Sequence, residues 1–87
     1  MTPAPSPAAR WRPNTRVSDW LVDEYVESYV RWREESIAVH AAYERCQRAE
    51  RSDRALAFAA CAAALDREEC AARTLAECAD RISRQLD

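Results

Sequence analysis

The four cysteines are the first candidates in the sequence for metal-binding or reactive side chains. They stand at positions 46, 61, 70 and 78, a spacing with no Cys-x-x-Cys pair, and the chain has a single His. Structural zinc sites use closely spaced Cys and His ligands, so we expect no metal site. The main interpretation is that these thiols are small apolar side chains at tight helix contacts.

Two other roles stay open for the thiols. Cys46 and Cys61 come together if the chain forms a hairpin between them, so they are the candidate disulfide. Cys70 lies on the opposite side of its predicted helix from the apolar residues. This position makes Cys70 the candidate reactive or cross-linking thiol.

Arg33, His40 and Glu68 lie on or beside the apolar rows of the predicted helices. In a helical bundle such residues could line a polar pocket, so a small all-α enzyme or ligand-binding bundle is the alternative function. The residue three before His40 is Ile37, so the Glu-x-x-His motif of carboxylate-bridged metal bundles is absent. The third group of a catalytic triad has no identifiable position. We therefore expect no catalytic activity and no cofactor.

The first sixteen residues combine Pro, Arg and Trp. They hold all four prolines, three Arg and no acid, which predicts a flexible Pro/Arg-rich arm at 1–16 before a helical domain at 17–87. Aromatic and Arg residues are enriched where proteins bind each other. The candidate partner-binding residues are therefore Arg10, Trp11, Arg12 and Trp20. Alternatively, Trp11 folds back on Trp20 and covers the end of the first helix.

Composition excludes several classes of function. The 87 residues include no Gly, which rules out Gly-rich phosphate-binding loops, and the net charge of -2 argues against nucleic acid as a partner. The chain has 13 Arg, 18 Ala and no Lys, a bias typical of GC-rich bacterial genes. Neither a signal peptide nor a membrane span is supported, so we expect a soluble cytoplasmic protein.

From residue 17 onward the sequence predicts long helices. This part has neither Pro nor Gly and is rich in residues that favour helices. Ser18, followed by acidic residues, is typical of a helix start. The predicted helices span about 18–50 and about 53–86, joined by a turn at Ser52 and Asp53. Asp66 and Glu69 form a capping-box-like pair, which leaves open a third helix from a break near Asp66.

Both predicted helices carry apolar residues at alternating steps of three and four, which is typical of helices packed at a shallow angle. The first row is Val22, Tyr25, Tyr29, Trp32, Ser36, Val39, Tyr43 and Cys46. The second row is Phe58, Cys61, Leu65, Glu68, Ala72, Leu75, Ala79, Ile82 and Leu86. If the chain reverses near Ser52, residues whose numbers add up to about 107 face each other. The predicted fold class is therefore all-α, an antiparallel αα-hairpin.

A further apolar stripe on the first helix predicts self-association. Its members are Val26, Val30, Ile37 and Ala41, which the second helix cannot cover because it already occupies the first row. A chain this short also buries only about 60% of its unfolded surface. We expect a homodimer in which two hairpins form a four-helix bundle. The predicted function is a small helical protein-protein interaction or adaptor protein with a further protein partner.

Overall fold

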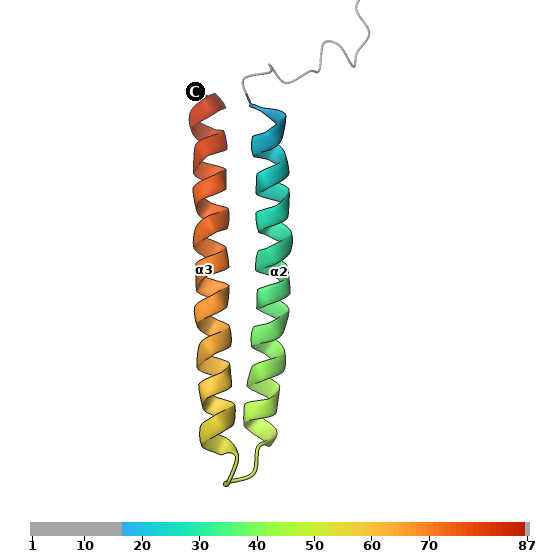
Figure 1. Cartoon of the computed structure of the whole chain (residues 1–87), viewed down its shortest axis with the longest axis vertical. Helices are drawn as coiled ribbons and strands as arrows, with labels where there is room; N and C mark the ends of the chain where they lie inside the picture. The colour runs from blue at the N-terminus through green and yellow to red at the C-terminus, as the bar shows by residue number, and fades with distance from the viewer. Residues whose placement is uncertain (1–16, 87) are drawn as a thin grey trace, which may run out of the picture.

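Two long antiparallel helices make up the part of the chain that the structure, a computed structural model, describes, residues 17–86 (Figure 1). Helix α2 spans Asp19–Arg48 and helix α3 spans Arg54–Leu86. The helices lie side by side, and the last turn of α3 ends beside the start of α2. The predicted all-α antiparallel hairpin is confirmed.

The helix ends fall close to the predicted ones, about 18–50 and about 53–86. α3 runs through Asp66 as one continuous helix, so the alternative of a third helix from a break near Asp66 is not found in residues 17–86. The physical reason is that this segment contains neither Pro nor Gly, and Asp66 itself is exposed. An exposed acid inside a helix interrupts no backbone hydrogen bond.

Backbone bonds at Ser18 tie the start of α2 to the end of α3. The Ser18 carbonyl accepts the N–H groups of Leu21 and Val22 at 3.0 and 3.2 Å. Its hydroxyl makes no capping bond, whereas its own N–H donates to Gln85 Oε1 at 3.2 Å. The open end of the hairpin is therefore closed by a bond between the two helices.

The chain reverses direction between Ala49 and Asp53, where the sequence places the turn. The Asp53 N–H donates to the Glu50 carbonyl at 2.9 Å, and the Asp53 carbonyl accepts the Ala57 N–H at 2.9 Å. No residue among 17–86 has a positive φ. The reversal therefore needs no Gly, which agrees with a chain that has none.

The contact between the helices is built from small side chains. Ser28 Oγ and Cys78 Sγ lie 3.4 Å apart, and both residues are buried. Their numbers add up to 106, which agrees with the predicted register of about 107. The buried apolar residues in the described part are Leu21, Ala42, Ala64, Ala71 and Cys78.

The structure corrects half of each predicted apolar row. Positions such as Trp32 and Val39 are half-buried, but Tyr29 and Tyr43 are exposed, and the residue just before each of them is buried in its place. Small side chains at Ser28 and Ala42 let the backbones approach closely and keep many atoms in contact. Large side chains in these positions would hold the two helices further apart.

Candidate interaction surfaces

Six large apolar side chains lie uncovered along one side of the hairpin. They are between 42% and 68% exposed, and we call them the apolar face: Val22, Tyr29, Tyr43, Phe58, Leu65 and Leu86. Each follows a core-facing residue by one position. Because the helices are antiparallel, the same step along each chain turns both rows to the same side of the hairpin.

A hollow near the turn shows that the two rows do share a side. It has a volume of about 420 Å³ and is lined by Val39 and Tyr43 from α2 and by Cys61 and Leu65 from α3. Apolar groups from both helices therefore border one shallow depression. A depression of this kind can receive an apolar side chain from another protein.

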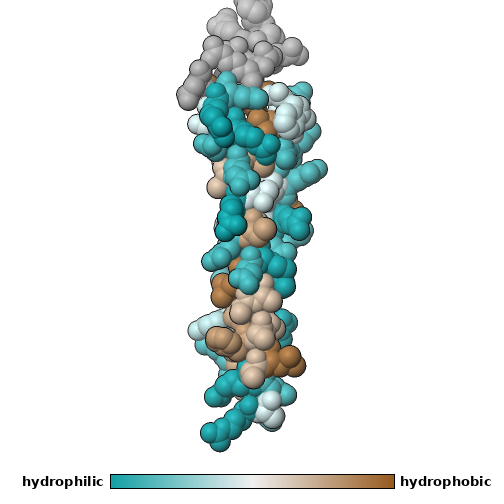
Figure 2. Space-filling view, turned by 60° about the vertical axis from the view of Figure 1, so that its left-hand side comes forward, coloured by the Kyte–Doolittle hydropathy of each residue, from teal (hydrophilic) through white to brown (hydrophobic). Residues whose placement is uncertain are grey.

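The first three turns of α3 are apolar on almost every side. Residues 55–65 carry no charge, and eight of these eleven residues are exposed, including Leu56 at 76%. Figure 2 shows hydrophobic surface gathered toward the turn end of the hairpin, and mostly hydrophilic surface toward the other end. A helix that is apolar all round is normally buried, so this segment lacks a cover in the single chain.

The opposite side of the hairpin is polar and carries ion pairs between the helices. Arg81 Nη2 lies 3.4 Å from Glu24 Oε1, and Arg67 Nε lies 3.4 Å from Glu35 Oε2. Arg81 also donates to Cys78 Sγ at 3.3 Å. The bond to Cys78, and then the charge of Glu24, raise the pKa of the Arg81 guanidinium above its ordinary value.

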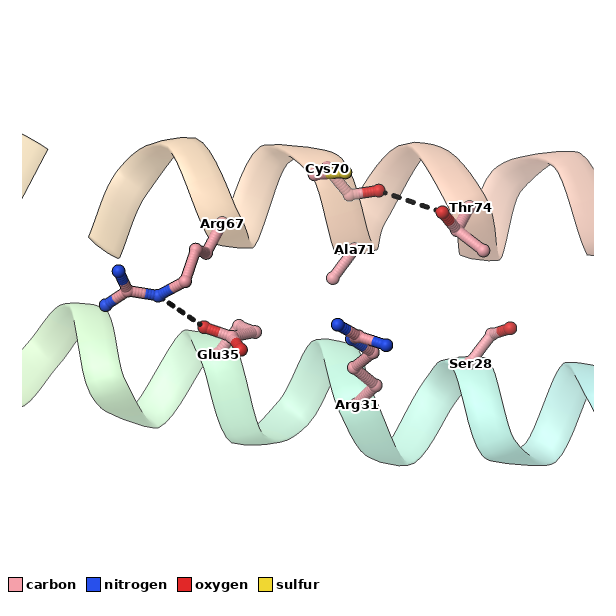
Figure 3. A pocket seen from close by; sticks show the side chains of 7 residues that line it. All are labelled: Ser28, Arg31, Glu35, Arg67, Cys70, Ala71 and Thr74. Atoms are coloured by element: carbon pink, nitrogen blue, oxygen red, sulfur yellow. Dashed lines mark hydrogen bonds and ion pairs between the residues drawn. The ribbon is translucent and has the colours of Figure 1, made fainter. Parts of the chain in front are cut away.

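A second hollow, of about 250 Å³, lies on this polar side (Figure 3). The guanidinium of Arg31 reaches toward α3 here, while Arg67 and Glu35 form an ion pair beside it. Thr74 turns its hydroxyl back to the Cys70 carbonyl at 3.1 Å. Charged and hydroxyl side chains thus line this hollow together with Cys70 and Ala71.

The predicted self-association stripe lies on the outer side of α2, away from α3. Val26, Val30 and Ile37 are exposed, and Ala41 is half-buried. Val26 and Val30 border a hollow whose other walls include Glu27 and Glu34. The stripe is thus accessible to a partner, but acidic side chains lie directly beside its apolar residues.

Of the three residues of the predicted polar pocket, one, His40, borders a hollow described above. Glu68 is half-buried between the helices, where its Oε1 accepts the Trp32 indole N–H at 2.8 Å. Arg33 and His40 are exposed on α2, and His40 borders the hollow beside Tyr43. A ligand-binding role for this set stays a prediction.

All four cysteines are free thiols, and their burial differs strongly. Cys70 is exposed, Cys46 and Cys61 are half-buried, and Cys78 is buried. Cys46 and Cys61 carry no disulfide here, and the pairing stays a prediction. Residues 17–86 contain no group of three or more His, Cys, Asp or Glu side chains arranged to hold a metal ion.

The predicted partner-binding residues fall mostly outside the described part of the chain. Arg10, Trp11 and Arg12 lie there, so their docking and fold-back roles both stay predictions. Trp20 is 60% exposed at the start of α2.

Comparison with known protein families, with curated proteins and with solved structures gave no match. Within residues 17–86, neither helix is long and apolar enough to cross a membrane.

The apolar face itself is what the sequence reasoning missed. Its members were predicted to lie inside the hairpin, because they are the larger residues of the periodic rows. The sequence did contain a signal for the buried row, which lies one residue earlier. Within each helix its small residues are separated by seven or fourteen positions: Ser28 and Ala42 on α2, and Ala64, Ala71 and Cys78 on α3. Small residues at this spacing favour close helix contact.

Proposed function

We propose that this chain is a small helical protein-protein interaction module that acts by binding and has no catalytic activity. Two hairpins pair through their apolar faces and form a four-helix bundle. The observation that carries the proposal is an apolar surface built by both helices: six large apolar side chains, 42% to 68% exposed, lie on one side of the hairpin, and the interhelical ion pairs lie on the other side. Large apolar side chains left exposed together on a small protein are typical of an interaction site.

A second copy is the occupant that fits this surface. The face runs along most of both helices, from Val22 to Tyr43 on α2 and from Phe58 to Leu86 on α3. Covering it takes a partner of similar length, and a second hairpin offers an apolar surface of equal length. A twofold axis can join one surface to itself without creating an open chain of contacts. In a four-helix bundle each helix then has neighbours on two sides.

The thin core supports the same proposal. Leu21 is the only buried apolar residue in the described part that is larger than Cys. Fully burying one Leu side chain contributes about 1.5–3 kcal/mol, whereas Ala contributes much less. Small scaffolds with so little core gain stability from oligomerisation.

The outer stripe of α2 is the rival surface for self-association. Val26, Val30, Ile37 and Ala41 would join two copies through α2 alone, leaving the apolar face open. The proposal therefore assigns the dimer contact to the face that both helices build. The segment with Arg10, Trp11 and Arg12, together with Trp20, would then be presented to a further protein partner.

The test compares two double variants with the wild type by size-exclusion chromatography with light scattering at micromolar concentration. Phe58→Ser with Leu65→Ser changes the apolar face, and Val30→Ser with Ile37→Ser is the matched change on the stripe. The wild type and the stripe variant should have twice the chain mass of 9.9 kDa. The face variant should have the mass of one chain.

Two outcomes would count against this assignment. A wild type with the mass of one chain at all micromolar concentrations would overturn the proposed self-association. If only the stripe variant were monomeric, the dimer contact would lie on the outer side of α2. Removing residues 1–16 should leave the protein dimeric, because the apolar face is carried by α2 and α3, which begin at Asp19 and Arg54.

A further inference from the structure

The apolar face is bordered by one row of residues on each helix. Along α2 the row is Val26, Arg33, His40 and Gln47, and along α3 it is Ala55, Ala62, Glu69, Ala76 and Ser83. The members recur every seven residues, nearly two helical turns, and all are exposed. Arg33 follows Tyr29 by four residues and Glu69 follows Leu65 by four, so both charges lie beside the apolar face.

Each border row carries one formal charge at neutral pH, and the two charges are opposite. Arg33 is the charged member on α2, and Glu69 is the charged member on α3. They stand on opposite borders of the same face, with both helices between them. Among residues 17–86 neither takes part in an ion pair.

Two hairpins can stack face to face by twofold symmetry in two ways. With their turns at the same end, each α2 lies against the partner's α3. With their turns at opposite ends, α2 lies against α2 and α3 against α3. These two arrangements bring different border charges together.

The same-end arrangement places opposite charges together. Ser28 and Cys78 lie at one height, so Glu69 lies at the height of Ile37. Arg33 is four residues from that height, which is about 6 Å at the helical rise of 1.5 Å per residue. His40 is three residues away on the other side. Long side chains span these offsets, so the partner's Glu69 would lie between Arg33 and His40.

The opposite-end arrangement places like charges together. α2 spans Asp19–Arg48 and α3 spans Arg54–Leu86, so Arg33 and Glu69 lie close to the midpoints of their helices. When two hairpins overlap fully in this arrangement, the midpoints meet. Arg33 then faces a second Arg33, and Glu69 faces a second Glu69, which is unfavourable at a close contact.

We propose that two copies of this chain associate face to face with their turns at the same end, and that Arg33 of each copy pairs with Glu69 of the other. His40 lies beside the same carboxylate. The inference rests on the proposed function, because it specifies how the two hairpins of that dimer are oriented. In this dimer, Arg33 and Glu69, which form no ion pair among residues 17–86 of the single hairpin, determine how the two copies are oriented.

Charge reversal tests this orientation, with dimer dissociation constants measured by sedimentation equilibrium. Arg33→Glu and Glu69→Arg should each weaken the dimer about tenfold, because both copies of the pair turn from attraction to repulsion. The double variant restores opposite charges across the interface and should bind like the wild type. Arg45→Glu makes the same charge change at an exposed position away from the apolar face, and should leave the constant unchanged.

The outcomes separate this inference from the proposed function. In the opposite-end arrangement, Arg33→Glu replaces one like-charge contact by another, so the single variant would dimerise like the wild type. That result, or a double variant weaker than both single variants, would overturn the orientation while leaving the dimer in place. A monomeric wild type would instead overturn the proposed function. Circular dichroism at each concentration verifies that the exposed substitutions leave the helices intact.

Discussion

The bond between Trp32 and Glu68 shows how a charged group is accommodated between the helices. The indole N–H donates to Glu68 Oε1 at 2.8 Å in a partly buried position. Hydrogen bonds to an ionised carboxylate are stronger than those between neutral groups. The bond gives the carboxylate of Glu68, the polar member of the periodic row of α3, a partner between the helices.

Removing the indole N–H should therefore cost stability. We expect Trp32→Phe to lower the free energy of unfolding by about 1–2 kcal/mol, because a half-buried carboxylate loses its partner. Urea unfolding at one fixed protein concentration measures the change. Trp20→Phe is the matched control, since Trp20 is 60% exposed and should change stability little. Equal effects of the two substitutions would contradict the role given to this bond.

The four thiols should react in the order of their exposure. Cys70 is exposed and Cys78 is buried, so a thiol reagent should label Cys70 first and Cys78 only when the hairpin opens. Time-resolved titration of the native protein measures this order, and Cys70→Ser should remove the fast phase. In denaturant without reductant, four thiols should titrate. A count of two would reveal the Cys46–Cys61 disulfide.

At the scale of the helices, periodicity predicted the hairpin, its register and its turn, because these depend on long-range regularity in one chain. It did not predict which row faces inward. Two neighbouring rows share every second position, such as Trp32 and Val39, and differ only in whether Tyr29 or Ser28 comes between. The choice depends on how closely two backbones can approach, which is a property of the pair and not of either helix.

The close approach of the helices gives a direct prediction. Ala64 is buried at 1% exposure, whereas its neighbour Ala63 is exposed. We expect Ala64→Leu to lower the free energy of unfolding by about 1–3 kcal/mol, because the larger side chain pushes α2 and α3 apart. Ala63→Leu makes the same change in composition with little effect. A stabilising Ala64→Leu would mean that the helices lie further apart than the structure shows.

At the scale of the whole molecule, the interhelical ion pairs and the apolar face lie on opposite sides of the hairpin. Ion pairs such as Glu35–Arg67 join the helices on one side, and the apolar face lies uncovered on the other. About half of the residues that periodicity selected for the interior, Tyr29 and Tyr43 among them, are left on the surface of a single hairpin. In the proposed bundle they become interior again, so the periodic rows describe the dimer better than the single chain.

In the proposed dimer, the hairpin draws stability from a second copy that covers its apolar face. Thermal unfolding, followed by circular dichroism over a hundredfold range of protein concentration, measures whether folding depends on this association. If folding and association are coupled, the melting temperature rises with concentration by mass action. A melting temperature that stays constant over that range, in a protein that unfolds reversibly, would contradict the claim.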